Sequence, residues 1–159
     1  MEKDQFEYLV EIVKRSGIPF VVHEHAAVRT MEDATQNLSF EIARIVKTVA
    51  FRTRNSGIVL AALRGAGRVD YPRLAALAGV NRRDLAPLSP EEVRELLGVE
   101  PGSVSPLSLR EDVALFIDED VLEILPTIYC GIGRPDRTLE IAAVELARLT
   151  GGRIGGFSR

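Results

Sequence analysis

The feature that most constrains the fold is the run at residues 45–51, seven mostly apolar residues with one cation, Lys47, among them. Its length and its β-branched residues predict a buried β-strand. Side chains alternate across a strand, so Lys47 shares the more apolar face with Val49 and Phe51. An ammonium on that face must extend to water, pair with an acid or meet an anionic ligand, because burying it unpaired is costly. The run alone leaves these three explanations open.

Lysine is rare in this chain. Of the 20 cationic side chains, only Lys3, Lys14 and Lys47 are lysine, and the others are arginine. Lysine presents a compact, titratable point charge, whereas arginine presents a fixed planar fork. The use of lysine in the strand indicates that a point charge or a titratable amine is needed there. The other explanation is a lysine that extends to water at a sheet edge.

Charge is unevenly distributed along the chain. The net charge is only −3, but residues 42–83 carry nine cations against one acid, Asp70. The next segment, residues 84–125, carries two cations and eleven acids. A basic block of this kind is typical of contact with a polyanion. The alternative is that the basic and acidic blocks neutralise each other within the fold.

Length and composition exclude several classes of protein. A chain of 159 residues with 46% hydrophobic content is expected to form one domain, residues 1–159. No run approaches the roughly 18 apolar residues of a membrane span, and the charged start is unlike a signal peptide, so we expect a cytoplasmic protein. One cysteine and two histidines make a poor ligand set. We therefore expect no metal and no cofactor, and Cys130 as a small buried residue.

Capping residues and apolar periodicity predict an α+β fold. Helices are expected at about 4–16, 30–37, 70–79 and 89–98, with a last helix that ends at Gly151. Strands are expected at 18–25, 45–51, 58–63, 113–118, 127–132 and 137–141, including two hairpins. These elements predict a single domain with a mixed, largely antiparallel sheet of six or seven strands, or a barrel-like sheet, surrounded by short helices. Residues 153–159 are expected to fray.

A second feature is the segment at residues 101–106, which is rich in turn-forming residues and lies between regular elements. Gly102 allows the backbone to approach a ligand closely, and successive N–H groups after such a glycine can point at one anionic oxygen. A connector of this composition is also commonly a simple turn.

Three segments together resemble the YbaK/ProX family of aminoacyl-tRNA deacylases, which is related to the insertion editing domain of bacterial prolyl-tRNA synthetase. They are residues 44–51, the Gly-x-x-x-Pro loop at 102–106 before an acid-rich strand, and residues 128–134. Residues 24–34 are similar to the early loop and helix of the family. Each motif is short, but their order and spacing agree over nearly the whole chain.

The resemblance implies roles for individual residues. Lys47 is similar to the strand lysine that holds the terminal nucleotide or the ester carbonyl. Gly102 and Ser103 resemble the part of the loop whose backbone N–H groups bind the reacting carbonyl. These three are the expected catalytic residues. The expected substrate-binding residues are His25, Thr30, Pro106, Gly131 and Gly133, of which Pro106 fixes the loop and the last two line the aminoacyl pocket. A solvent-facing or capping role is the alternative for His25.

The resemblance implies a trans-editing deacylase that hydrolyses the ester of mischarged tRNA, most simply tRNA(Pro) carrying Cys, Ala or Ser, with the basic block against the RNA. The expected partners are the 3′ end of that tRNA and prolyl-tRNA synthetase. No Ser-His-Asp set is visible, so we expect water or a substrate group to attack the ester. Two alternatives are a non-catalytic tRNA- or nucleotide-binding module of the same fold and a hydrolase of small esters. The sequence does not determine the amino acid, the nucleophile or the oligomeric state.

Overall fold

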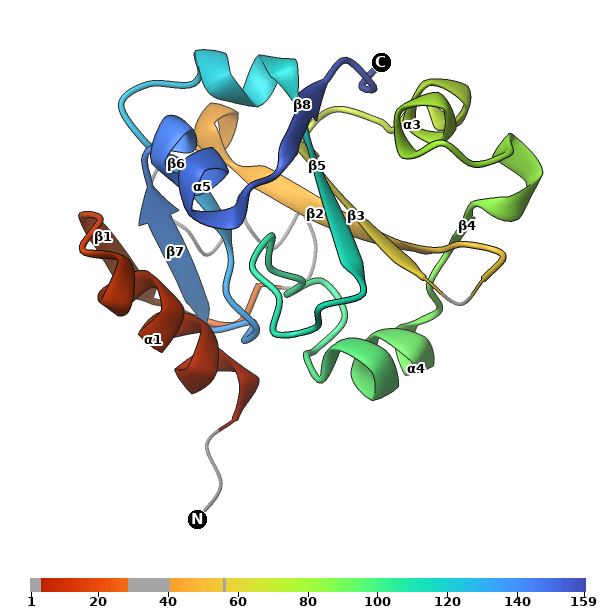
Figure 1. The fold of residues 1–159 in the computed structure, drawn as a ribbon. Helices are drawn as coiled ribbons and strands as arrows, with labels where there is room; N and C mark the ends of the chain where they lie inside the picture. Colours follow the sequence, from red (N-terminus) through yellow and green to blue (C-terminus); the bar gives the residue numbers. More distant parts are fainter. Residues whose placement is uncertain (1–3, 29–40, 56) are drawn as a thin grey trace.

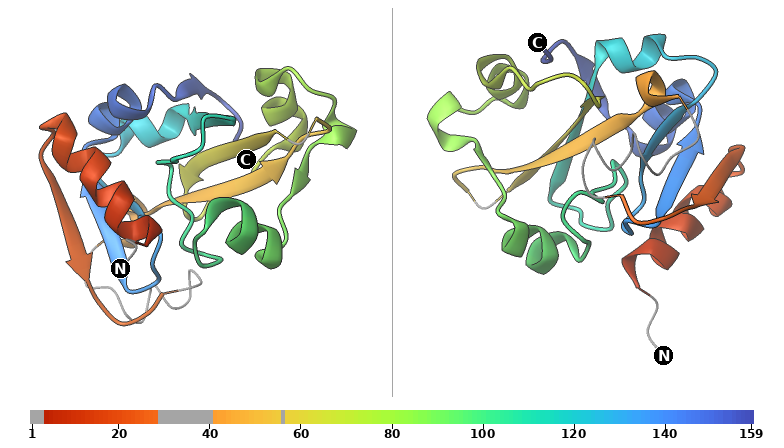
Figure 2. Two further views of the ribbon diagram at one scale, coloured as in Figure 1. Left: turned by 60° about the horizontal axis from the view of Figure 1, so that its bottom comes forward. Right: turned by 180° about the vertical axis from the view of Figure 1, so that it is seen from behind.

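The computed structural model describes residues 4–28, 41–55 and 57–159 (Figures 1 and 2). It confirms the predicted α+β class, and the described strands form two sheets of three and five strands rather than one sheet or a barrel. A bridge between Ile45 and Tyr129 links the two sheets. The helix predicted at 30–37, which includes Thr30, lies outside the described residues.

The smaller sheet has the order β1–β7–β6 and is antiparallel throughout. Its strands are β1 (Phe20–Glu24), β6 (Ile128–Gly131) and β7 (Arg137–Ile141). Helices α1 (Gln5–Ser16) and α5 (Ala143–Thr150) pack on one face, where Val13 and Leu146 join Leu139 in a buried core. Asp4 and Gly17 cap α1 as predicted.

The larger sheet has the order β4–β2–β3–β5–β8. Its strands are β2 (Val46–Arg52), β3 (Ile58–Arg64), β4 (Ala86–Pro87), β5 (Val113–Asp118) and β8 (Arg153–Gly155). The hairpin predicted between the second and third strands is present, with Lys47 opposite Leu63. The β3–β5 and β5–β8 pairs are parallel. The chain between β3 and β5 makes a long crossover through helices, and the chain between β5 and β8 passes through β6, β7 and α5.

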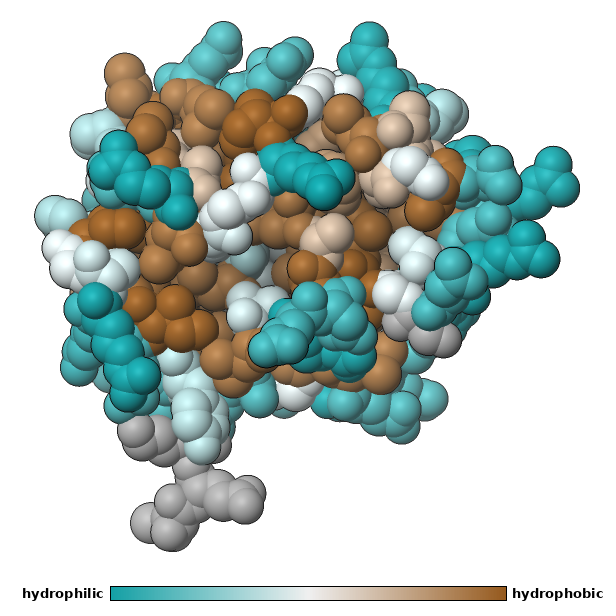
Figure 3. Space-filling view, in the orientation of Figure 1, coloured by the Kyte–Doolittle hydropathy of each residue, from teal (hydrophilic) through white to brown (hydrophobic). Residues whose placement is uncertain are grey.

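The crossover contains α3 (Tyr71–Ala78), η2 (Arg82–Asp84) and α4 (Pro90–Glu92), which continues as the π-helical segment η3 (Val93–Leu97). The predicted caps are confirmed: Asp70 and Gly79 bound α3, and Ser89 forms a capping box with Glu92. Two further short turns are η1 (Ile42–Arg44) and η4 (Glu119–Glu123). Hydrophilic side chains project from the edge formed by the β2–β3 turn and the segment from α3 to β4 (Figure 3).

The side chains on the two faces of β2 belong to different buried clusters. Phe51 packs under α3 with Leu74 and Phe157, and the partly buried Val49 belongs to the same cluster. On the other face, Ala50 packs with Val104 from the loop before β5. Lys47 therefore lies on the α3 side of the strand, whereas Val46 and Thr48, the residues before and after it, lie on the loop side.

The prediction that residues 153–159 fray is wrong. β8 pairs with β5, and Phe157 is fully buried. The buried carboxylate of Asp118 accepts hydrogen bonds from the Phe157 N–H at 2.8 Å, the Ser158 N–H at 3.1 Å and the Ser158 hydroxyl at 2.7 Å. The segment is ordered because its aromatic ring and its backbone donors both find partners that are distant in sequence.

Among the described residues, no helix is both long and apolar enough to span a bilayer.

Replacing Phe157 with alanine tests the docked tail. The ring is completely buried in the core under α3, so Phe157→Ala should lower the free energy of unfolding in urea by about 3–5 kcal/mol. The control Val144→Ala removes a side chain that is 55% exposed and should change it by less than about 0.5 kcal/mol. Equal effects of the two substitutions would show that the tail is not docked.

Candidate active site

The centre of the candidate site is the loop at residues 100–106, between η3 and β5. Pro101 and Gly102 occupy the middle of a turn in which the Ser103 N–H donates to the Glu100 carbonyl at 3.0 Å. Gly102 has a φ of +85°, the left-handed conformation that a type II turn requires at this position. Ser103 and Pro106 are buried. The local Pro-Gly pair therefore shapes the loop, and its packing holds that shape.

The glycines after β6 bring this loop into contact with the smaller sheet. A Cβ atom added to Gly131 would lie 2.5 Å from the Val104 carbonyl oxygen and 3.1 Å from that of Ser103. The Gly133 N–H donates to the Ser103 carbonyl at 3.0 Å. The structure thus unites four of the predicted site residues, Gly102, Ser103, Gly131 and Gly133, and it uses Gly131 to permit close approach of two backbone segments.

Several polar groups of the loop lack partners. The hydroxyl of Ser103 is buried and has no hydrogen-bond partner in the described structure. The N–H groups of Gly102 and Val104 find no acceptor among the described residues either. The Ser103 hydroxyl is buried, and a buried polar group without a partner costs about 1–3 kcal/mol, so a ligand oxygen there would recover part of that energy. Gly102 is exposed, so its N–H is open to a ligand or to water. The Ser103 N–H, predicted to bind the carbonyl, is engaged within the turn.

Thr48 was not singled out by the sequence. Its hydroxyl is buried without a hydrogen-bond partner in the described part of the chain. It projects from β2 on the same face as Val46 and Ala50. Val46 belongs to the buried cluster that includes Leu107, and Ala50 to the one that includes Val104, so Thr48 lies on the loop side of the strand. An unpartnered threonine hydroxyl gives no signal in a sequence, because its isolation depends on the folded surroundings.

Lys47 lies on the opposite side of β2 from Thr48. Its Nζ donates to the Gly67 carbonyl at 2.5 Å, and it is partly buried. Burial, followed by the nearby charge of Arg68, lowers the pKa of the Lys47 amine from its usual 10.5. In the structured residues Lys47 has no carboxylate partner. Of the three explanations that the sequence left open, pairing with an acid therefore receives no support here.

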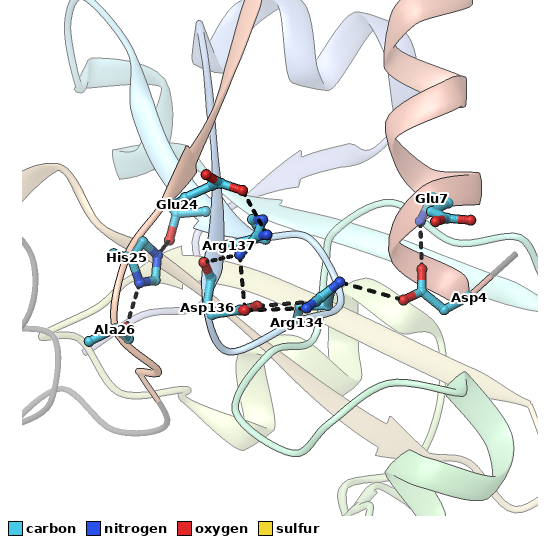
Figure 4. Close-up of polar contacts among 9 residues, drawn as sticks. Asp4, Glu7, Glu24, His25, Ala26, Arg134, Asp136 and Arg137 are labelled. Carbon is cyan, nitrogen blue, oxygen red and sulfur yellow. Dashed lines mark hydrogen bonds and ion pairs between the residues drawn. The ribbon is translucent and has the colours of Figure 1, made fainter.

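His25 is held at the end of β1 beside the β6–β7 turn (Figure 4). Its Nδ1 lies 2.7 Å from the Ala26 carbonyl and therefore donates to it, which leaves Nε2 of the neutral ring to accept from the Thr138 hydroxyl at 2.7 Å. Below it, Asp136 pairs with Arg134 at 3.1 Å and with Arg137 at 2.9 Å. The His25 backbone N–H donates to the Asp136 carbonyl at 3.1 Å, so the residue is fixed beside the turn that also carries Gly133.

A groove of about 540 Å³ runs along that turn. Its walls come from the start of α1, the end of η3 and the β6–β7 turn. The lining residues include Phe6, Ala27, Val99, Gly133 and Arg134. Gly133 also donates to the loop, so the groove is adjacent to the unpartnered groups.

A partly buried polar cluster on the face of the smaller sheet away from α1 and α5 was also missed by the sequence. Glu140 accepts from the Thr127 hydroxyl at 2.5 Å, pairs with His23 at 2.7 Å and lies 3.4 Å from Arg44. The guanidinium of Arg44 stacks 4.6 Å from the centre of the Tyr129 ring. The hydrogen bond from Thr127 is the main reason that the pKa of Glu140 lies below its ordinary value. This cluster anchors η1, and hence the start of β2, to the smaller sheet.

Cys130 is buried, as the sequence predicted, and burial raises the pKa of its thiol to about 12. A thiol held neutral in this way is inert as a nucleophile. Within the described ranges, no group of three His, Cys, Asp or Glu side chains is arranged to hold a metal ion.

Comparison with known proteins agrees with the resemblance seen in the sequence. A family model described as an aminoacyl-tRNA editing domain matches residues 25–149. The multifunctional Ser/Thr-tRNA deacylase ProXp-y of Escherichia coli (strain K12) is 26% identical over 154 residues, which are 95% of this chain and 91% of that protein. The proline–tRNA ligase of Xanthomonas axonopodis pv. citri (strain 306) is 38% identical over 93 residues, 58% of this chain but only 16% of the ligase.

The fold is also similar to that of a solved structure. A proposed trans-editing enzyme for prolyl tRNA synthetase superposes with a TM-score of 0.83 at 27% identity, covering 100% of this chain and 99% of that one. The resemblance predicted from short motifs is therefore confirmed over the whole length of the fold.

Removing the charge of Arg68 tests the explanation given for the lowered pKa of Lys47. Because Arg68 contributes to the lowered pKa of Lys47 and burial remains, Arg68→Ala should raise that pKa part of the way towards 10.5, as followed by NMR titration of the lysine side chain. Arg15→Ala on α1 is the control and should leave the titration unchanged. An unchanged Lys47 pKa in Arg68→Ala, or a Lys47 pKa above 10.5 in wild type, would contradict this explanation.

Proposed function

Because this chain belongs to the aminoacyl-tRNA editing domain family, we propose that it hydrolyses the ester bond of mischarged aminoacyl-tRNA, acting in trans as a separate protein. The observation that carries the proposal is the loop at residues 100–106. Its buried Ser103 hydroxyl and the N–H groups of Gly102 and Val104 lack partners in the described structure. An ester offers the oxygens that these donors need.

In the proposed mechanism the loop stabilises negative charge on the ester carbonyl. Attack on an ester places charge on the carbonyl oxygen, and each preorganised N–H donor aimed at it is worth about 3–4 kcal/mol. Gly102 and Val104 are the proposed donors, since the Ser103 N–H is already bonded to Glu100. The close contact of Gly131 with Val104 supports a rigid arrangement of these donors.

The attacking group is proposed to be water or a group of the substrate. Ser103 is a poor nucleophile because none of the described basic side chains contacts its hydroxyl. The histidines bond elsewhere, His23 to Glu140 and His25 to Thr138. Cys130 is buried with a raised pKa. An enzyme nucleophile would need a base within hydrogen-bond reach.

We assign Lys47 to the nucleotide rather than to the carbonyl. Its ammonium lies on the α3 side of β2, whereas the cluster containing Val104 lies on the other side. A phosphate near Lys47 would offset the repulsion from Arg68 and favour the protonated amine. His25, Pro106, Gly131 and Gly133 are proposed to shape the aminoacyl pocket.

The proposed amino acid is serine. The motifs favour tRNA(Pro) carrying Cys, Ala or Ser, while the name of the Escherichia coli relative specifies Ser and Thr. Serine is common to both. Prolyl-tRNA synthetase, whose mischarged product would be the substrate, and a cytoplasmic site of action belong to the same proposal.

Release of amino acid from seryl-, alanyl-, cysteinyl- and threonyl-tRNA(Pro) tests the proposal. Wild type should release serine, and Lys47→Ala should lower kcat/KM by about 10- to 100-fold, as expected for loss of a charge-assisted hydrogen bond of 1.5–3 kcal/mol. Lys14→Ala on α1, an exposed lysine, is the matched control and should retain full activity.

Three results would contradict the proposal in different ways. Undiminished activity in Lys47→Ala would remove this lysine from the mechanism. Salt-dependent tRNA binding without turnover would indicate a non-catalytic binding module. Turnover of free aminoacyl esters that is unaffected by tRNA would indicate a hydrolase of small esters.

A further inference from the structure

Lys47 and three exposed arginines form a line of positive charge on the α3 side of the larger sheet. We define the basic strip as Lys47, Arg68, Arg73 and Arg82. The three arginines are exposed. They begin at the segment after β3, pass through the first turn of α3 and end in η2.

The arginines of the basic strip form no ion pair with the described residues, a property that they share with the exposed Arg54, Arg83, Arg94 and Arg153. In contrast, Arg15, Arg110 and Arg148 each pair with a carboxylate close in sequence. The strip therefore carries positive charge that the fold leaves available for an external anion.

The acids nearest in sequence are occupied by other contacts. Asp70 accepts from the Arg73 backbone N–H at 3.1 Å as the cap of α3. Asp84 lies 3.4 Å from the side-chain amide of Asn81. Both carboxylates act locally on the backbone or on an amide rather than on the guanidinium groups.

Ring contacts link Arg82, at one end of the strip, to Phe51 of β2. Lys47 and Phe51 lie on the same face of β2, about 13 Å apart at about 3.3 Å per residue. The Tyr71 ring meets Phe51 edge-on at 5.4 Å, and the Arg82 guanidinium lies 4.4 Å over the Tyr71 ring. Stacking restricts the guanidinium, so less conformational entropy is lost when it binds an anion.

We propose that the basic strip is the docking surface for the sugar–phosphate backbone of the tRNA acceptor arm, with Lys47 at the 3′ end and Arg82 several nucleotides away. The proposal rests on the proposed function and extends it to the body of the RNA. A spaced line of unpaired cations matches the regular charges of a phosphate backbone, and such contacts position the RNA without reading its sequence.

The distance between Lys47 and Arg82 makes the docking surface testable. An aminoacyl ester of adenosine alone could occupy the site near Lys47 without reaching Arg82, whereas a full tRNA would contact both. The double variant Arg73→Ala with Arg82→Ala should therefore raise KM for seryl-tRNA by about 2- to 30-fold, as expected for two exposed ion contacts. Its turnover of seryl-adenosine should match wild type, which also shows that it is folded.

The control variant combines Arg15→Ala with Arg148→Ala, two exposed arginines on α1 and α5 that lie outside the strip, and should leave KM for seryl-tRNA unchanged. Binding of uncharged tRNA, measured by filter binding against salt, gives a second readout that needs no catalysis. The slope of log K against log salt should fall by about 0.7–0.9 for each strip arginine removed and should not change in the control.

The outcomes separate this proposal from the proposed function. Normal KM and an unchanged salt slope in the strip variant, with active wild type, would overturn the docking surface and leave the deacylase intact. Absence of any ester turnover in wild type would overturn the deacylase, and the binding slopes would still decide whether the strip contacts RNA. Equal losses with seryl-tRNA and seryl-adenosine would also overturn the docking surface.

Discussion

The contact between Gly131 and the backbone of Ser103 and Val104 is the constraint on which the candidate site depends. No side chain larger than hydrogen fits at position 131, because a Cβ there would lie 2.5 Å from the Val104 carbonyl oxygen. The Gly133 N–H then bonds the Ser103 carbonyl. These two contacts hold the loop at residues 100–106 against the smaller sheet, and they leave the N–H groups of Gly102 and Val104 without acceptors among the described residues.

The two sides of strand β2 carry different functional groups. Its loop side carries Thr48 and packs against the cluster that includes Val104. Its α3 side carries Lys47 and leads through Phe51 and Tyr71 to Arg82. Strand alternation alone is sufficient to produce this division. We therefore assign ester chemistry to one side of β2 and the phosphate backbone to the other.

Sequence patterns predicted the elements whose signals are local. Asp4 and Gly17 bound α1, and Ser89 and Glu92 form a capping box, because each pair interacts within one turn of helix. The hairpin of β2 and β3 follows from two apolar runs around a short break. The family resemblance further predicted Gly102, Gly131 and Gly133 as site residues, and in the structure Gly131 and Gly133 contact the loop that contains Gly102.

The features that sequence reasoning missed depend on partners far apart in the chain. Phe157 is buried because β8 pairs with β5 and Asp118 binds the tail backbone, 39 residues away. Arg44 and Glu140 are 96 residues apart. The smaller sheet likewise depends on the pairing of β1 with β7, in which Phe20 lies opposite Ile141. Capping rules and periodicity do not report such contacts.

A crystal structure with a non-hydrolysable seryl-adenosine amide would test the central claim most directly. The account predicts that the carbonyl oxygen of the amide lies about 3 Å from the backbone nitrogen of Gly102 or Val104, within hydrogen-bond distance, and that the nucleotide lies on the side of β2 that carries Lys47. A carbonyl oxygen that contacts Lys47 while these loop N–H groups remain without a ligand oxygen would contradict it.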